Sequence, residues 1–168
     1  TIINRFPVGS RFYIPLMIGF YTGLRIGETF ALTWDDIDLE KNELTVNKQV
    51  ITRRVANENK KAWYFGSPKT KSSNRTVKFG ETLAEALKTE KAKQEENETK
   101  YGGFYTIYVT QNEVDEKGNT IKRIVPVQNC VSVSLPIVKM VCVEEYGEYT
   151  STDSFKYAAR VIHHELKL

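Results

Sequence analysis

The stretch that most constrains this chain is residues 22–38, which read T-G-L-R-I-G-E-T-F-A-L-T-W-D-D-I-D. A single arginine, Arg25, lies there between two glycines in an otherwise apolar run, three residues before Glu28. Gly23 allows a tight turn of the backbone. The apolar residues that follow have helical spacing: Ile26, Phe30 and Ala31. We therefore expect Arg25 at or near the start of a short helix, with Glu28 one turn further on, where its carboxylate can orient the guanidinium without covering it.

An arginine held in this way suits a phosphate ligand. Its guanidinium presents a rigid fork of donors, which matches the spacing of phosphate oxygens. The alternative is that Arg25 is a structural arginine, paired with Glu28 and packed on Trp34, since such pairs are common on helices.

The wider pattern of this stretch adds a family resemblance. Thr-Gly-x-Arg-x-x-Glu followed by Ala-Leu-x-Trp-x-Asp-Ile-Asp resembles the first conserved box of the tyrosine recombinases, the phage-type integrase family. The resemblance implies that Arg25 contacts the scissile phosphate of DNA and that Glu28 supports it. It also implies the amino-terminal part of a catalytic domain, of the kind found in integrative mobile elements.

A second stretch, residues 67–79, contains P-K-T-K-S-S-N-R-T-V. A small basic hairpin placed after the arginine box resembles the family's lysine-bearing turn, whose lysine acts as general acid. The resemblance assigns that role to Lys69, with Lys71 as the second choice, and it gives Lys71 and Arg75 as DNA-binding residues. The alternative is that these cations only solvate an exposed turn.

The charge distribution agrees with a nucleic-acid partner. The net charge is only +3, but residues 52–78 carry eight Lys and Arg side chains against one Glu. Cations gathered in one segment are the footprint of a surface that contacts phosphates. The expected partner is double-stranded DNA, at attachment sites if the family resemblance holds.

Alternation and turn signals predict an α+β fold. Strands are expected over 43–52, 62–66 and 74–79, joined as a three-stranded antiparallel meander. With the helices, this gives a mainly helical domain, and the family resemblance implies that residues 1–168 are a truncated tyrosine-recombinase catalytic domain. Residues 101–136 carry no family motif and are expected to form an extra β-rich insertion.

Other elements are placed by local patterns. Helices are expected over 12–21 and 81–97, and another after the N-cap signal at Ser151. A hairpin is expected to pair 104–109 with 121–127, and a further strand is expected over 138–143.

The sequence gives no reason to expect a metal or a cofactor. The two cysteines, Cys130 and Cys142, have no CxxC spacing and no histidine cluster beside them, so plain thiols are expected. His163 and His164 fall near the end of a predicted helix, where a histidine is commonly a favourable cation. Neither is followed three residues later by arginine, as the family's His-x-x-Arg box requires.

Nothing in the chain predicts a membrane protein. No apolar run approaches the ~18 residues of a membrane-spanning helix, and the first residues lack the order of a secretory signal. A cytoplasmic location is therefore expected. The length of 168 residues suits one domain, and the absence of an initiator Met suggests a piece of a longer protein.

The family resemblance implies a mechanism for the intact protein. A tyrosine attacks a DNA phosphodiester and forms a 3′-phosphotyrosine, within a tetrameric synapse and without metal or nucleotide. None of the nine tyrosines has the context of the nucleophile, so the chain is expected to be inactive alone. The alternative function is a non-catalytic basic module that binds nucleic acid, in which Arg25 is only structural.

Overall fold

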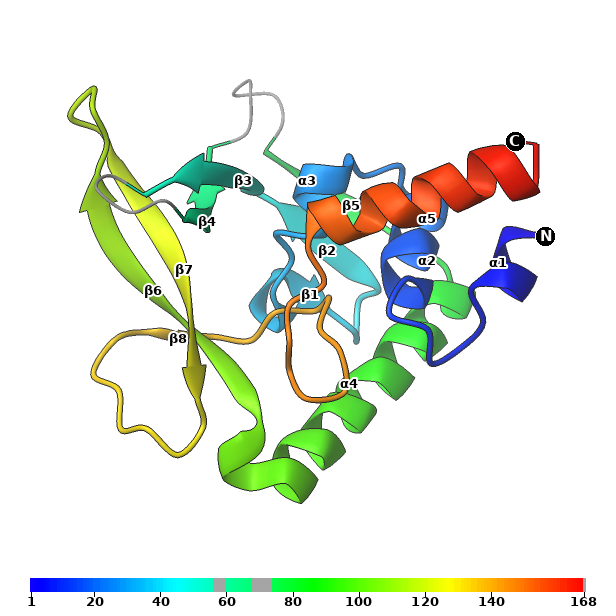
Figure 1. Ribbon diagram of the computed structural model, residues 1–168. Helices are drawn as coiled ribbons and strands as arrows, with labels where there is room; N and C mark the ends of the chain where they lie inside the picture. The colour runs from blue at the N-terminus through cyan, green and yellow to red at the C-terminus, as the bar shows by residue number, and fades with distance from the viewer. Residues whose placement is uncertain (56–59, 68–73, 168) are drawn as a thin grey trace.

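The computed structural model describes residues 1–55, 60–67 and 74–167, and it has helices and two antiparallel sheets (Figure 1). The helical elements are α1 (Ile2–Arg5), α2 (Tyr13–Thr22), α3 (Ile26–Thr29), η1 (Trp34–Asp36), α4 (Glu81–Tyr101), η3 (Gly102–Phe104) and α5 (Thr152–Glu165). The strands are β1 (Ile37–Asp38), β2 (Glu43–Val46), β3 (Gln49–Arg54), β4 (Lys61–Gly66), β5 (Arg75–Lys78), β6 (Thr106–Val114), β7 (Thr120–Gln128) and β8 (Ile137–Val138). The predicted α+β class is confirmed.

The smaller sheet has the order β1-β2-β5 and packs on helices. Leu44 and Val46 alternate inward along β2 and are buried. They share a core with Ile18 of α2 and with Leu83 and Leu87 of α4. Leu83 and Leu87 lie one turn apart on one face of α4, which is why this largely charged helix has a buried side.

The larger sheet has the order β3-β4-β7-β6-β8. Its long hairpin, β6 and β7, extends at the left of Figure 1, away from the helices. A second core packs against this sheet. Its members come from distant parts of the chain and include Phe30, Val50, Tyr108, Ile124 and Tyr149.

The predicted three-stranded meander is confirmed in its first pairing, since β3 pairs antiparallel with β4, and is wrong in its second, between β4 and β5. The single strand expected over 43–52 is two strands in different sheets, β2 and β3, and β5 pairs with β2 while β4 pairs with β7. The break follows from Lys48, which takes an inward position between Val46 and Val50 in the alternation. Its ammonium pairs with the Asp36 carboxylate, which is 8% exposed. A charged side chain thus occupies the position where the alternation would place the next buried residue. The strand is therefore interrupted there.

The helices agree more closely with the predictions. The helix expected over 12–21 is α2, and α4 begins as expected but continues to Tyr101. α5 starts after Ser151, whose hydroxyl accepts a hydrogen bond from the N–H of Ser154 at 3.2 Å. α3 is shorter than expected, because Thr33 begins the next element. There the Asp36 carboxylate accepts from the Thr33 N–H at 2.8 Å.

The predicted hairpin around Gly118 is confirmed, with longer strands than expected. The strand expected over 138–143 is reduced to β8, followed by an isolated bridge between Thr33 and Met140. That residues 101–136 are an insertion stays a prediction. In the fold, β6 and β7 from that segment complete the larger sheet.

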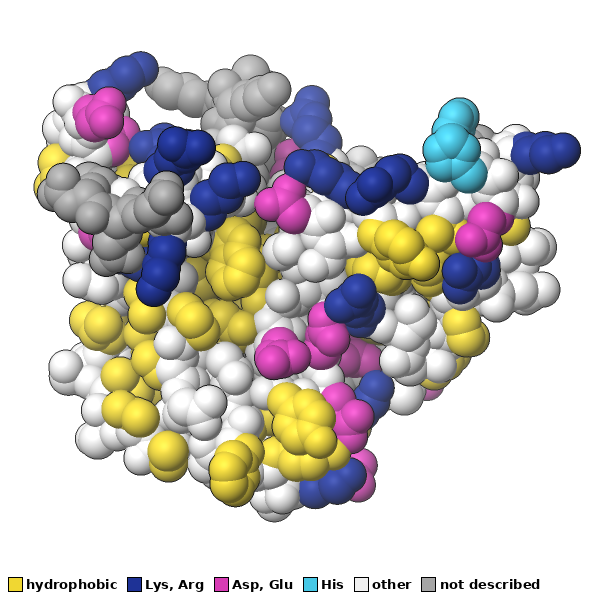
Figure 2. All heavy atoms as spheres, viewed as in Figure 1, with side chains coloured by type: hydrophobic (Ala, Val, Ile, Leu, Met, Phe, Trp, Pro, Cys, Tyr) yellow, Lys and Arg dark blue, Asp and Glu magenta, His cyan; other side chains and the backbone are white. Residues whose placement is uncertain are grey.

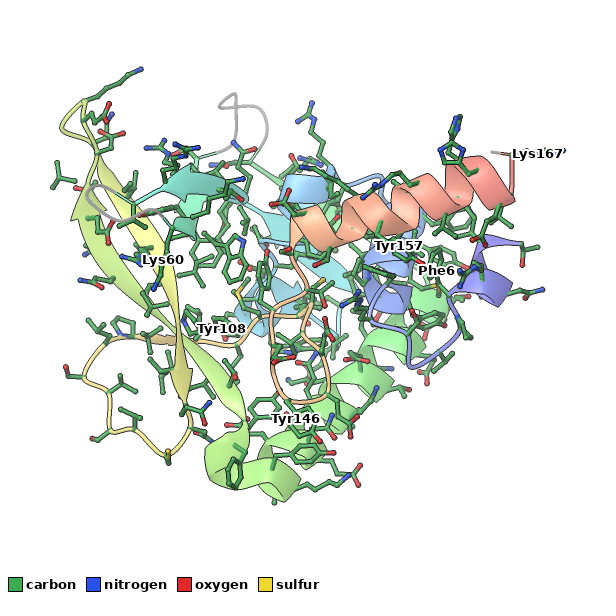
Figure 3. All side chains as sticks on the ribbon, in the orientation of Figure 1. Phe6, Lys60, Tyr108, Tyr146, Tyr157 and Lys167 are labelled. Carbon is green, nitrogen blue, oxygen red and sulfur yellow. The ribbon has the colours of Figure 1, made fainter. Side chains whose placement is uncertain are left out.

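A third core joins the two ends of the described chain. α5 lies across α1 and α2 (Figure 1), and Phe6, labelled in Figure 3, is buried with Phe12, Ala158 and Val161. The outward face of α5 is polar and charged. Among the described helices, none combines the length and apolar character that crossing a membrane requires.

Candidate phosphate-binding site

A left-handed turn presents Arg25. Gly23 ends α2 with φ of 66°, a conformation that glycine adopts without a Cβ penalty. Its N–H donates to the Gly19 carbonyl at 3.0 Å. Arg25 then has an extended backbone and occupies the N-cap position of α3. The prediction that Arg25 lies at the start of a short helix is confirmed.

The second glycine of the motif brings α3 close to β3. A Cβ added at Gly27 would lie 3.4 Å from the Val50 carbonyl oxygen and 3.7 Å from Cβ of Gln49. Both distances are ordinary van der Waals contacts, so α3 packs directly against β3 at this glycine. This contact fixes the site on a strand of the scaffold.

Glu28 is the buried carboxylate of the site, with a side chain only 4% exposed. Its Oε2 accepts a hydrogen bond from the Arg25 backbone N–H at 3.0 Å, as in a capping box. Its Oε1 lies 3.4 Å from Nη1 of Arg25. Glu28 thus contacts both the backbone and the guanidinium of Arg25, as predicted.

The Arg25 side chain is 71% exposed. Its guanidinium reaches solvent while Glu28 contacts one of its nitrogens. The alternative of an arginine packed on Trp34 does not fit this exposure. Trp34 is buried and its indole N–H donates to Gln94 of α4 at 2.9 Å.

A second guanidinium, that of Arg75 on β5, binds the same carboxylate. Its Nη2 donates to Oε2 of Glu28 at 2.9 Å and its Nη1 donates to Oε1 at 3.2 Å. This is the two-pronged geometry that arginine forms with carboxylates. Sequence reasoning gave Arg75 as a DNA-binding residue and did not find this ion pair.

These contacts keep Glu28 ionised. The hydrogen bonds from Arg75 lower the pKa of Glu28, and they outweigh burial, which acts in the opposite direction. The Arg25 N–H and the charges of the two guanidiniums lower the pKa further. The same hydrogen bonds raise the pKa of Arg75.

Lys69 and Lys71 lie outside the described residues, so the structure does not place their side chains. It does place both ends of the segment that carries them. The carbonyl of Ser67 accepts from the Gln49 side chain at 2.9 Å, and Gln49 lies beside Gly27 of α3. At the other end, Arg75 binds Glu28 of α3. Ser67 and Arg75, which lie on either side of the lysine-bearing segment in the sequence, are thus both near α3, the helix that follows Arg25.

Basic side chains from three elements meet at a shallow cavity of about 360 Å³. Arg53 and Arg54 of β3, Lys61 of β4 and Lys156 of α5 line it, together with Asp153, which pairs with Lys156 at 2.6 Å. Figure 2 shows Lys and Arg side chains along the upper edge of the molecule, over the larger sheet and α5.

The contribution of α5 to this basic surface was missed at the level of sequence. Lys156 and Arg160 lie four residues apart, so they share one helical face, and both are exposed. That spacing was the available signal. Their distance in sequence from the basic segment hid it.

No group of histidine, cysteine, aspartate and glutamate side chains in the described ranges could hold a metal ion. Cys142 is buried, with its thiol 3.9 Å from the Thr29 carbonyl, and Cys130 is exposed. Burial raises the pKa of Cys142. His163 and His164 are exposed in the last turn of α5.

The profile of the phage integrase family matches residues 1–125. The chain belongs to the phage integrase family.

Three curated relatives are integrases or recombinases. A tyrosine recombinase XerC-like protein of Caldanaerobacter subterraneus subsp. tengcongensis is 37% identical over 118 residues, 67% of this chain and 30% of the relative. Prophage integrase IntR of Escherichia coli K12 is 40% identical over 68 residues, 40% of this chain and 14% of the relative. The ICEBs1 integrase of Bacillus subtilis 168 is 37% identical over 84 residues, 47% of this chain and 20% of the relative. The matched part of the chain spans less than a third of the length of each.

A solved structure agrees with the fold over nearly the whole chain. The Tn1549 transposon integrase in complex with a circular intermediate DNA has a TM-score of 0.57 and 17% identity, covering 99% of this chain and 42% of the integrase. A second complex of that integrase with such DNA has a TM-score of 0.52 and 18% identity, covering 92% of this chain and 39% of the integrase. At these identities the likeness concerns the fold.

Proposed function

We propose that this chain is part of a site-specific DNA recombinase that breaks and rejoins double-stranded DNA at attachment sites through a 3′-phosphotyrosine intermediate. Membership of the phage integrase family supports the proposal, as do relatives named as prophage and ICEBs1 integrases. The integrase with the same fold was solved bound to DNA. In the intact protein the exchange takes place in a tetrameric synapse.

Arg25 takes the role of phosphate contact in this proposal. In the first step a tyrosine oxygen bonds to the phosphorus, the bond to the 5′ oxygen breaks, and negative charge grows on the other phosphoryl oxygens. A guanidinium held in place before the reaction stabilises that charge, and removing one such donor costs about 3 kcal/mol in the barrier. Glu28 positions Arg25 through its contacts with the backbone N–H and the guanidinium.

Lys69 takes the role of general acid. Its ammonium gives a proton to the departing 5′ oxygen, which leaves as a hydroxyl. Lys71 is the second choice for this role, and otherwise contacts DNA phosphates. No metal or nucleotide enters the step.

One observation carries these assignments. Ser67 and Arg75 lie on either side of the sequence segment that carries Lys69 and Lys71, and both are near α3, Ser67 through Gln49 and Arg75 through Glu28. The proposal therefore puts the Lys69 ammonium and the exposed guanidinium of Arg25, at the N-cap of α3, on the same phosphate.

We propose no nucleophile among the tyrosines of this chain. Tyr64, Tyr105, Tyr108 and Tyr149 are buried. Burial raises the pKa of Tyr105 to about 12 and raises the pKa of Tyr149 well above its usual value, which is the opposite of activation. The other five tyrosines lack the sequence context of the family's nucleophile, so the 168-residue chain alone is expected to leave DNA uncut.

The test uses the full-length protein and a labelled duplex that carries the attachment site. Arg25→Ala is expected to lower the cleavage rate by about 100-fold to 1,000-fold, while the affinity for DNA falls by no more than about tenfold. Lys100→Ala is the matched control, because Lys100 is an exposed cation at the far end of α4. Cleavage by Arg25→Ala at the rate of the unmutated protein would refute the role of Arg25.

The second candidate function is a basic module that binds nucleic acid without catalysis. The cavity lined by Arg53, Arg54, Lys61 and Lys156 favours it, because those cations need no reacting tyrosine to bind phosphates. If it is correct, Arg25→Ala leaves cleavage of the full-length protein unchanged, and the affinity of the 168-residue chain still falls with salt.

A further inference from the structure

Arg75 lies on β5 with its backbone opposite Val46 of β2, and its side chain reaches the buried carboxylate of α3. The Arg75 side chain is 34% exposed, whereas that of Arg25 is 71% exposed. The two guanidiniums thus share one carboxylate but differ in how far they reach solvent.

The contacts of the carboxylate are unequal. Arg75 binds both oxygens of Glu28, at 2.9 Å and 3.2 Å, while the guanidinium of Arg25 reaches one oxygen at 3.4 Å. The backbone N–H of Arg25 also holds Oε2, at 3.0 Å. Arg75 therefore neutralises most of the negative charge of Glu28. The positive charge of Arg25 stays available for another anion.

We propose that Arg75 is a positioning residue, which acts on Arg25 through Glu28 and makes no phosphate contact of its own. The proposal rests on the proposed role of Arg25. It replaces the prediction that Arg75 is a DNA-binding residue.

The physical reason is the cost of a buried carboxylate without a partner. Glu28 is almost fully buried and has to be paired. Without Arg75, the cation that the described part of the chain still holds beside this carboxylate is Arg25, at 3.4 Å, and its guanidinium would be drawn onto Glu28 and away from solvent. With Arg75 in place, the carboxylate holds the backbone N–H of Arg25 and contacts one nitrogen of its guanidinium. The rest of that guanidinium stays available for a phosphate.

The chain offers a matched control on the same strand. Lys78 lies three residues after Arg75 on β5, where side chains alternate between faces. The Lys78 side chain is 82% exposed and pairs with Glu43 at 3.4 Å. Lys78→Gln removes the same charge as Arg75→Gln and leaves Glu28 untouched.

The experiment measures binding of the 168-residue chain to a fluorescent duplex across a range of salt concentrations. Each lost phosphate contact lowers the slope of log K against log salt by about 0.9, which is nearly tenfold in affinity at 0.1 M salt. The proteins compared are the unmutated chain, Arg25→Ala, Arg75→Gln, the double variant and Lys78→Gln. Circular dichroism verifies that each is folded.

The proposal predicts that Arg75→Gln lowers the slope by at most as much as Arg25→Ala, and that the double variant is no weaker than Arg25→Ala alone. Additive losses, with the slope of the double variant lowered by about 1.8, would mean that Arg75 contacts a phosphate itself and would overturn the proposal. An unchanged affinity for Arg75→Gln, or an equal loss for Lys78→Gln, would also overturn it.

A second comparison covers the case in which Arg75→Gln does not fold. Glu28→Gln removes the buried charge, so that Arg75→Gln added to it leaves no unpaired carboxylate. The proposal predicts that these two proteins bind DNA equally, and a weaker double variant would contradict it. If Arg25→Ala binds and cleaves like the unmutated protein, the proposed function fails first, and the positioning role fails with it.

Discussion

Arg75 and Glu28 are 47 positions apart in the sequence and form a two-pronged ion pair, with nitrogen to oxygen distances of 2.9 Å and 3.2 Å. The pair joins β5 of the smaller sheet to the short helix α3, which packs on the larger sheet. The buried Glu28 carboxylate thus links the two sheets next to the position where the Arg25 side chain extends into solvent.

The lowered pKa of Glu28 predicts a pH dependence of stability. Because the folded protein holds this pKa below the ordinary value of 4.5, ionised Glu28 stabilises the fold above that pH. The contribution is lost as pH falls below 4.5. We therefore expect Glu28→Gln to be less stable to urea than the unmutated chain at pH 7, with the gap narrowing at pH 3.5.

The control for this prediction is Glu85→Gln. Glu85 lies on α4 with a side chain 70% exposed, and such surface pairs contribute little. Its urea midpoint is expected to follow that of the unmutated chain at both pH values. If the difference in urea midpoint between Glu28→Gln and the unmutated chain is the same at both pH values, the negative charge of Glu28 does not stabilise the fold.

Gly147 is predicted to be the least replaceable glycine of the described turns. It has φ of 80°, and an added Cβ would lie 2.2 Å from the Thr106 carbonyl oxygen. Gly118 has φ of 79° and open space around it. Gly118→Ala is therefore expected to cost about 1 kcal/mol for the backbone alone, and Gly147→Ala about 3 kcal/mol or more, because the backbone of β6 has to move.

Urea unfolding of the two alanine variants measures this difference directly. Equal losses of stability would show that the close approach of Gly147 to β6 does not hold in solution. The comparison is matched, since both residues have nearly the same φ.

The hydrogen bond between Trp34 and Gln94 is predicted to stabilise the core. Gln94 accepts from the indole N–H at 2.9 Å and donates to the Val141 carbonyl at 2.8 Å, so its amide bridges two buried groups. Gln94→Ala leaves both without this partner and is expected to cost about 1–3 kcal/mol per unsatisfied group. Gln111→Ala, at an exposed position on β6, is the control.

The measurement is again the free energy of unfolding in urea, together with the near-ultraviolet tryptophan signal, recorded in a Trp63→Phe background so that it reports on Trp34. A loss no larger than that of Gln111→Ala would contradict the role of this bridge. A change in the tryptophan signal without a loss of stability would show that the indole has found another acceptor.

The sequence by itself determined the features that depend on neighbouring residues. Gly23 and the spacing after it placed Arg25 at the start of a helix, and the Ser151 signal placed the start of α5. The hairpin of β6 and β7 was likewise readable from its turn. The pattern Thr-Gly-x-Arg-x-x-Glu followed by Ala-Leu-x-Trp-x-Asp-Ile-Asp, with the basic stretch 67–79, was enough to indicate the family.

Only the tertiary structure decided which strands pair and which charges meet. β4 takes β7 as its neighbour, β5 returns to β2, and Arg75 reaches Glu28 instead of solvent. Lys156 joins the cations of β3 and β4 in the same way, from a helix far along the chain. The reason is physical: turns and caps are set by the dihedral preferences and hydrogen bonds of adjacent residues, whereas these pairings are set by which buried surfaces and charges the whole chain brings together.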